Sequence, residues 1–265
     1  MTASGLHRCR EWAADLVEHH LRGTTADPDA PETYQVSTIS ALMDGIDDGD
    51  TTILELLRHG DFGLGTFNSL DGEMVILDGE CHHLRADGTA TRANPTDRTP
   101  FAAVMPFRAE LEIPIRSATD RAALTALVDA SIASIDHLYG IRVEGTFSAV
   151  HTRTVKAQTR PYPSLTEATK GQSETVLDDV TGTLVGFRTP DSEQGISVAG
   201  YHLHFLDDAH ERGGHALDFV LDSGRVAVSH RSDLRLQLPA SGPSLHAHLS
   251  AAELSAQIRQ AEGDG

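Results

Sequence analysis

The chain has 265 residues, of which 39% are hydrophobic and 23% are charged, and its formal net charge is −18 with histidine neutral. This length and composition can bury the core of one large domain or two smaller ones, which excludes an intrinsically disordered protein. The negative charge argues against nucleic acid and anionic membrane surfaces as partners, because both would be repelled. An anionic substrate would need local positive charge, from a metal ion or from arginine.

The cysteine content and the length of the apolar stretches indicate where in the cell the protein is expected. Cys9 and Cys81 provide neither a disulfide framework nor a CxxC metal site. No apolar run approaches the length of a transmembrane helix, and the N-terminal residues lack the apolar core of a secretion signal. We therefore expect a cytoplasmic protein without a membrane partner.

The N-terminal part of the chain predicts a peripheral helix followed by a compact unit. Apolar residues recur at helical spacing over 6–21, and a polar, proline-containing linker follows. The compact part is expected to begin near Tyr34. A short helix is predicted over 50–60, with Asp50 or Thr51 as its N-cap and Gly60 at its end.

The middle of the chain predicts a meander of strands and one longer helix. Apolar or alternating segments over 62–68, 73–85 and 101–115 are separated by Asp-Gly turns, which is typical of strands. The segment 117–140 has the clearest helical periodicity, with Ser117 or Thr119 as its N-cap. Its apolar stripe consists of Leu124, Leu127, Val128, Ile132 and Ile135.

The remaining pattern predicts an α+β fold with two β-sheet domains. A strand is expected over 141–155, and the polar segment 156–177 is expected to cross between domains. The similarity of 62–84 to 181–205 is compatible with an internal duplication. The predicted fold has a mixed sheet in the N-terminal domain, an antiparallel sheet in the C-terminal domain and a few packing helices. Its parts are a helix and linker over 1–33, a β-rich domain over 34–165, and a metal-binding β domain with a C-terminal helix over 166–265.

Three histidines in an apolar setting are the strongest functional signal of the sequence. His202 and His204 are two residues apart, so in a strand both imidazoles project from one face while Leu203 and Phe205 supply the core. A hairpin would return His215 beside them. Three imidazoles with an open position form the arrangement of a catalytic zinc site. The other interpretation is a histidine pair on the solvent-facing side of an edge strand.

His210 and the adjacent pairs His82–His83 and His19–His20 are not expected to be ligands. His210 lies in the predicted loop between the two histidine strands, where a solvated side chain is the simpler interpretation. His82 and His83 are adjacent, as are His19 and His20, and adjacent side chains in regular structure point apart.

Several motifs, in the same order, resemble the α-acetolactate decarboxylase family. They are GTFNSLDGEMVILDGE, HLYGIRVEGTF, VHTRTVKAQTRPYPSL and the histidine segment YHLHF…GGHALD. The resemblance runs from about Tyr34 to the C-terminal helix. It implies a lyase that decarboxylates (S)-2-acetolactate to (R)-acetoin and CO2 in acetoin and butanediol biosynthesis. It also implies Zn2+ or another divalent metal as cofactor, without thiamine diphosphate, pyridoxal phosphate or NAD.

The resemblance assigns roles to particular residues. Arg153 would hold an anionic part of the substrate, and Arg142 competes for that role. A glutamate of the C-terminal helix would reach the site, with Glu262 as first choice and Glu253 as second. Without the resemblance, the simpler reading is that these charged residues face solvent or close turns. The full set is His202, His204 and His215 for the metal, Glu73, Arg153 and Glu262 for catalysis, and Thr66 and Arg153 for substrate binding.

Two other functions are compatible with the histidine pattern. A cupin-like metal enzyme acting on a small hydroxy-keto acid also uses HxH and a later histidine, but it needs a glutamate soon after the pair, where this chain has Asp208. A non-enzymatic metal-binding module would have no use for Arg153 and Glu73 beside the metal. The sequence also has no Gly-rich phosphate-binding loop ahead of a helix. The resemblance implies that the partner is a small 2-hydroxy-3-keto acid, and a homodimer is compatible with the sequence.

Overall fold

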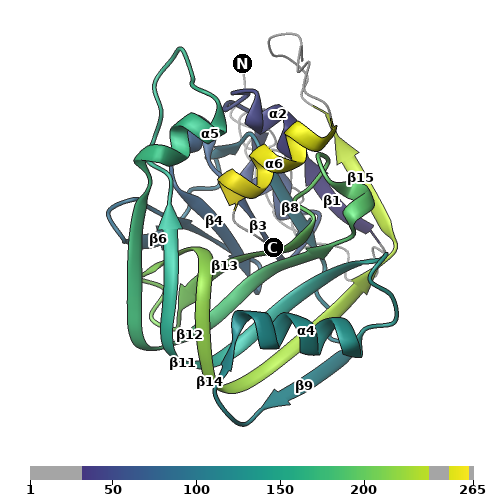
Figure 1. Cartoon of the computed structure of the whole chain (residues 1–265). Helices are drawn as coiled ribbons and strands as arrows, with labels where there is room; N and C mark the ends of the chain where they lie inside the picture. Colours follow the sequence, from purple (N-terminus) through teal and green to yellow (C-terminus); the bar gives the residue numbers. More distant parts are fainter. Residues whose placement is uncertain (1–31, 239–250, 263–265) are drawn as a thin grey trace, which may run out of the picture.

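The computed structural model describes residues 32–238 and 251–262, and it places two large β-sheets face to face (Figure 1). The helix predicted over 6–21 and the linker that follows it lie outside the described residues. The predicted α+β class, with one mixed and one antiparallel sheet, is confirmed. Within the described ranges, no helix is both long enough and apolar enough to cross a membrane.

The first sheet has seven strands in the order β15-β1-β8-β3-β4-β5-β6. Neighbouring strands are antiparallel except β1 and β15, which are parallel and bring the two ends of the range 32–238 together. The strands are β1 (Glu32–Val36), β3 (Phe62–Thr66), β4 (Glu73–Leu77), β5 (Glu80–Leu84), β6 (Ala90–Arg92), β8 (Ala102–Met105) and β15 (Asp233–Gln237).

The helix predicted over 50–60 is wrong in its length and its cap. A two-residue strand, β2 (Thr51–Thr52), which pairs with β7 (Arg98–Thr99), precedes α3 (Ile53–Leu56). Thr52 is the N-cap, because its hydroxyl accepts from the Glu55 amide at 3.2 Å and the Glu55 carboxylate accepts from the Thr52 amide at 2.9 Å. Gly60 does not end this helix. A Cβ there would lie 2.5 Å from the Met105 amide nitrogen, so the glycine allows a close passage beside β8.

The second sheet is antiparallel and almost closes on itself. Its strand order is β10-β14-β11-β12-β13, with β9 also paired to β14 and a further pairing between β13 and β14. Strands β11 to β14 therefore form a ring. The strands are β9 (Leu111–Ile115), β10 (Thr119–Asp120), β11 (Leu138–Thr154), β12 (Ser173–Thr189), β13 (Gly200–Asp207) and β14 (Gly213–Arg231).

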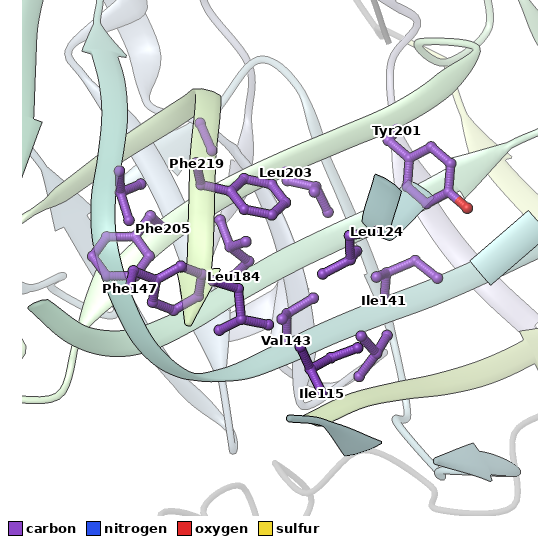
Figure 2. Close-up of a cluster of buried hydrophobic side chains, with 14 of the residues drawn as sticks. Ile115, Leu124, Ile141, Val143, Phe147, Leu184, Tyr201, Leu203, Phe205 and Phe219 are labelled. Carbon is purple, nitrogen blue, oxygen red and sulfur yellow. The ribbon is translucent and has the colours of Figure 1, made fainter. Parts of the chain in front are cut away.

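The main core lies on the face of the second sheet that turns away from the first sheet, and Figure 2 shows its side chains. The Phe147 ring meets Phe205 and Phe219 edge to face, with centroids 5.4 Å and 6.0 Å apart. Edge-to-face contacts of this kind stabilise a core beyond the burial of apolar area. Leu203 and Phe205 belong to this cluster, as the alternation around the histidines predicts.

The helix predicted over 117–140 is shorter and begins later. α4 spans Arg121–Ser131, and Asp120 is its N-cap, with Oδ1 accepting from the Ala123 amide at 2.8 Å. Ser117 and Thr119 were therefore the wrong caps. The chain leaves the helix at Ile132 and enters β11 at Leu138. The predicted apolar stripe is only partly buried, with Leu124 and Val128 inside and Leu127 and Ile135 exposed.

The polar segment 156–177 connects β11 to β12 within one sheet. It contains α5 (Leu165–Ala168) and the 3₁₀ turn η2 (Thr169–Gly171), and β12 already begins at Ser173. Both sheets use strands from each side of residue 165, since β9, β10 and β11 precede it and β15 follows it. The division into domains at this residue stays a prediction. The boundary between the two sheets does not fall there, because each sheet contains strands from both proposed domains.

The two parts of the internal similarity have related local structures. β3 and β4 form an antiparallel pair joined through η1 (Asn68–Leu70), and β12 and β13 form one joined through η3 (Asp191–Glu193). A duplication remains a prediction.

An apolar layer joins the two sheets, and helices cover one end of it. Phe62 and Val75 of the first sheet pack in one cluster with Phe187 and Leu206 of the second. α2 (Ile39–Met43), α5 and α6 (Ala251–Glu262) lie together at one end of the molecule (Figure 1) and share a further cluster that includes Ile258. The space between the sheets is thus enclosed on several sides.

Asp120→Ala is expected to lower the free energy of unfolding by about 1 kcal/mol, because the Ala123 amide loses its acceptor. Urea denaturation measures this change. Asp120→Asn keeps an acceptor and should cost less, and Ser117→Ala should be nearly neutral. A larger loss for Ser117→Ala than for Asp120→Ala would show that the cap is assigned to the wrong residue.

Candidate metal centre between the two sheets

His202, His204 and His215 come together on the face of the second sheet that turns toward the first. Their exposed fractions are 8%, 1% and 2%. The ring centroids are 5.1 Å apart for His202 and His204, 5.0 Å for His202 and His215, and 5.3 Å for His204 and His215. One ligand nitrogen of each lies within 4.8 Å of the other two. The structure therefore gathers the three histidines that the sequence singles out.

Strand register explains why these side chains meet. His215 of β14 lies opposite His204 of β13 on one side and opposite Arg153 of β11 on the other. Directly opposite residues of an antiparallel pair share a face of the sheet. Arg153, His215 and His204 thus form a row across three adjacent strands, and His202 shares the face two residues along β13.

Two glycines ahead of His215 allow the strands to approach closely. A Cβ at Gly213 would lie 2.1 Å from the Phe205 carbonyl oxygen, and a Cβ at Gly214 would lie 2.8 Å from the Arg153 carbonyl oxygen. Real Cβ atoms do not come so near to backbone, so glycine is required here. The Gly-Gly pair therefore sets the position of His215 between β11 and β13.

His204 is bonded to the opposite sheet. Its Nδ1 lies 2.8 Å from the carbonyl oxygen of Met74 in β4. Because a carbonyl oxygen only accepts, Nδ1 carries the proton and donates. In the neutral imidazole the lone pair then lies on Nε2, which is 3.6 Å from Oε2 of Glu73. Metal-binding histidines commonly have their tautomer fixed by such a carbonyl.

The charge state of His202 also suits a metal ligand. Burial lowers its pKa to about 3, and the positive charges of Arg153 and Arg121 add to the decrease. The imidazole is therefore neutral at pH 7, which is the state that coordinates a metal. Three enclosed imidazole donors fit a divalent ion such as zinc.

Glu73 and Thr66 face the histidines from the first sheet. They lie opposite each other in the β3–β4 pair and are 7% and 6% exposed. The Thr66 hydroxyl donates to the Gly72 carbonyl oxygen at 2.7 Å, so toward the pocket it presents lone pairs. Glu73 is thus a buried carboxyl beside His204 and not a solvent-facing turn residue.

The structure brings Arg153, and not Arg142, to the histidines. Arg153 is 3% exposed, and its Nη1 donates to Oε1 of Gln172 at 3.3 Å. Arg142 forms ion pairs with Asp78, at 2.7 Å, and with Glu144. Arg153 lines the pocket beside the histidines, whereas Arg142 does not.

The pocket has a polar side and an apolar side. The apolar side was not predicted, because its residues follow the ordinary pattern of core side chains. Gln172 was missed as well, since it lies in a polar segment without a motif. The polar lining is Thr66, Glu73, Arg153, His202 and His204, and the apolar lining includes Ile39, Leu42, Leu70, Phe101, Val155 and Leu165.

The C-terminal helix α6 lies close to Arg153. Ile258 is buried with Ile39 and Leu165, and Gln260 lines a groove that Arg153 also lines. The side chains of Glu262 and Glu253 lie outside the described residues, so the choice between them stays a prediction.

Comparisons with known proteins agree on one family. The model of the family "Alpha-acetolactate decarboxylase" matches residues 33–251. The chain is 43% identical to the alpha-acetolactate decarboxylase of Klebsiella aerogenes over 242 residues, 91% of this chain and 93% of that one. It is 46% identical to that of Methylococcus capsulatus over 219 residues, 83% of this chain and 84% of that one. The crystal structure of the Bacillus subtilis alpha-acetolactate decarboxylase aligns with a TM-score of 0.83 at 39% identity, covering 88% of this chain and 100% of that one.

His204→Ala is expected to remove about one equivalent of bound divalent metal per chain, because the set of three imidazoles loses one of its ligands. Elemental analysis after dialysis measures the content, and circular dichroism checks the fold. His230→Ala, on the same strand as His215 but outside the cluster, should keep its metal. Full metal content and full activity in His204→Ala would exclude this site.

Proposed function

Since this chain belongs to the alpha-acetolactate decarboxylase family, we propose that it converts (S)-2-acetolactate to (R)-acetoin and CO2 with a divalent ion, zinc by preference, bound to His202, His204 and His215. The observation that carries the proposal is a cluster of three buried imidazoles, two of which line one pocket together with a buried arginine and a buried glutamate. A metal-storage site would not need these charged groups. A cupin-like site is disfavoured, because Asp208 is exposed in the turn after β13.

The chemistry requires stabilisation of one electron pair and delivery of one proton. The substrate has a carboxylate and a hydroxyl on the carbon next to a ketone. When the bond to CO2 breaks, its electron pair moves onto the ketone oxygen, and an enediolate results. A metal ion bound there would supply a Lewis acid that stabilises this negative charge, which contributes several kcal/mol. A proton added to carbon then completes acetoin.

Arg153 would bind the substrate's carboxylate. Its planar guanidinium matches a carboxylate with two parallel hydrogen bonds. In a chain of net charge −18, this buried positive charge would also offset the repulsion of an anionic substrate. An arginine side chain keeps its proton in proteins, so we assign it no role in proton delivery.

Glu73 is the group to which we assign the proton. Its carboxyl faces the histidines from the opposite sheet and would deliver the proton from one face, so that a single enantiomer forms. The Thr66 hydroxyl donates its proton to the Gly72 carbonyl oxygen. Its oxygen would therefore accept a hydrogen bond from the substrate hydroxyl. Glu262 would relay protons from the C-terminal helix.

The remaining parts of the proposal concern cofactors, partners and location. We propose that the reaction needs no thiamine diphosphate, pyridoxal phosphate or NAD, and that the partner is a small molecule. A homodimer and a cytoplasmic location stay predictions from the sequence.

Turnover of racemic 2-acetolactate with and without a chelator tests the proposed function. The purified protein should release CO2 and acetoin, lose this activity after metal removal and recover it with Zn2+ alone. Undiminished turnover by metal-free protein would contradict the role of the metal. Failure of the zinc-loaded protein to release either product would contradict the proposed substrate.

Arg153→Lys is expected to lower kcat about a hundredfold or more, near 2.7 kcal/mol, because an ammonium cannot reproduce the bidentate contact. Steady-state kinetics at full metal content measures the change. Glu73→Gln, which keeps the shape and removes the proton carrier, should fall comparably. Arg142→Lys is the matched control and should stay near the parent rate. The opposite ranking of the two lysine variants would show that the wrong arginine was chosen.

A further inference from the structure

A second set of metal-binding side-chain types lies outside the pocket. One ligand atom each of Glu80, His82 and His210 lies within 4.8 Å of the other two, and the pocket lining contains none of them. We propose that these three residues bind a second divalent ion, zinc by its ligand chemistry, which fastens the β13–β14 turn to the first sheet. This inference does not depend on the function proposed above.

The burial of the His82 imidazole without hydrogen-bond partners among the described residues is the main support for this second site. Its exposed fraction is 3%, and within the part of the chain that the structure describes neither ring nitrogen has a hydrogen-bond partner. Leaving a buried polar group without a hydrogen-bond partner is unfavourable, because the group loses its contact with water and gains nothing in return. A metal ion would use a ring lone pair of this imidazole.

Glu80 lies on the same face of β5 as His82. The two are two residues apart in a strand, so both side chains point toward the second sheet, as does Val75, which lies opposite His82. The Glu80 carboxylate is 45% exposed and 3.2 Å from Nη1 of Arg92. An exposed ion pair contributes little to stability, so Arg92 competes only weakly for this carboxylate.

The β13–β14 turn is built so that it carries His210 to this place. The buried Asp207 carboxylate accepts from the amides of Glu211, at 2.8 Å, and Arg212, at 3.0 Å. The Glu211 carbonyl oxygen accepts from the Ala90 amide of β6 at 2.7 Å. The turn is therefore attached to the first sheet, and the His210 ring centroid lies 4.5 Å from that of His82.

The donor set suits zinc. Two imidazole nitrogens and one carboxylate oxygen, with water in the remaining position, form a common tetrahedral arrangement. The expectation that His82 and His83 point apart is met, because His83 stacks on Phe67 at 3.9 Å on the other face of β5. The sequence did not indicate that Glu80 of the same strand and His210 of the β13–β14 turn would lie beside His82.

Zinc titration of the full chain tests the inference. Bound and free metal are measured for the dialysed wild type, for His210→Ala and for Arg92→Ala, with Zn2+ as the only added ligand. His210→Ala should bind one equivalent fewer than the wild type, gain less thermal stability from zinc and keep its decarboxylase rate. Arg92→Ala should bind this equivalent more tightly, because the carboxylate loses a competing cation.

The matched control is Glu211→Gln, which removes a charge from the same turn, keeps the backbone contact to Ala90 and should titrate like the wild type. An unchanged zinc count in His210→Ala, or an equal loss in Glu211→Gln, would overturn the second site. His204→Ala separates the two proposals, since it should lose a different equivalent together with activity.

Discussion

The hydrogen bond from Nδ1 of His204 to the Met74 carbonyl joins the two sheets at the point where the candidate site is assembled. Its acceptor is a backbone atom of β4, so the position of the His204 ring depends on the position of that strand in the first sheet. It also directs Nε2 toward Glu73. The orientation of one imidazole thus depends on the packing of the whole interlayer, including Val75 and Leu206.

The apolar layer between the two sheets keeps His202 neutral while it also holds a positive charge for an anionic substrate. The histidine face must stay dry and neutral, and burial keeps His202 unprotonated. The substrate is an anion, and the protein that binds it has a net charge of −18. The buried Arg153, which lies opposite His215, supplies positive charge beside the histidines. Apolar residues from α2 and α5 close the remaining wall, so that the polar groups face a pocket and not bulk water.

Local spacing predicted the parts of the site that lie within one strand. The period of two in β13 places His202 and His204 on one face and Phe205 in the core, and this was confirmed. The contact of His204 with β4 could not be predicted, because pairing between distant strands has no local signal. The cap of α4 was missed for the opposite reason, since Ser117, Thr119 and Asp120 are all competent caps and only backbone geometry selects among them. Family resemblance, more than spacing, singled out Glu73 and Arg153.

We propose that a metal ion binds between the three histidines and faces Glu73 and Arg153. Anomalous X-ray diffraction at the zinc edge, on crystals of the active zinc-loaded protein, tests it most directly. The account predicts a peak about 2.0–2.1 Å from one nitrogen each of His202, His204 and His215. Active, zinc-loaded crystals with no peak at that position would contradict it.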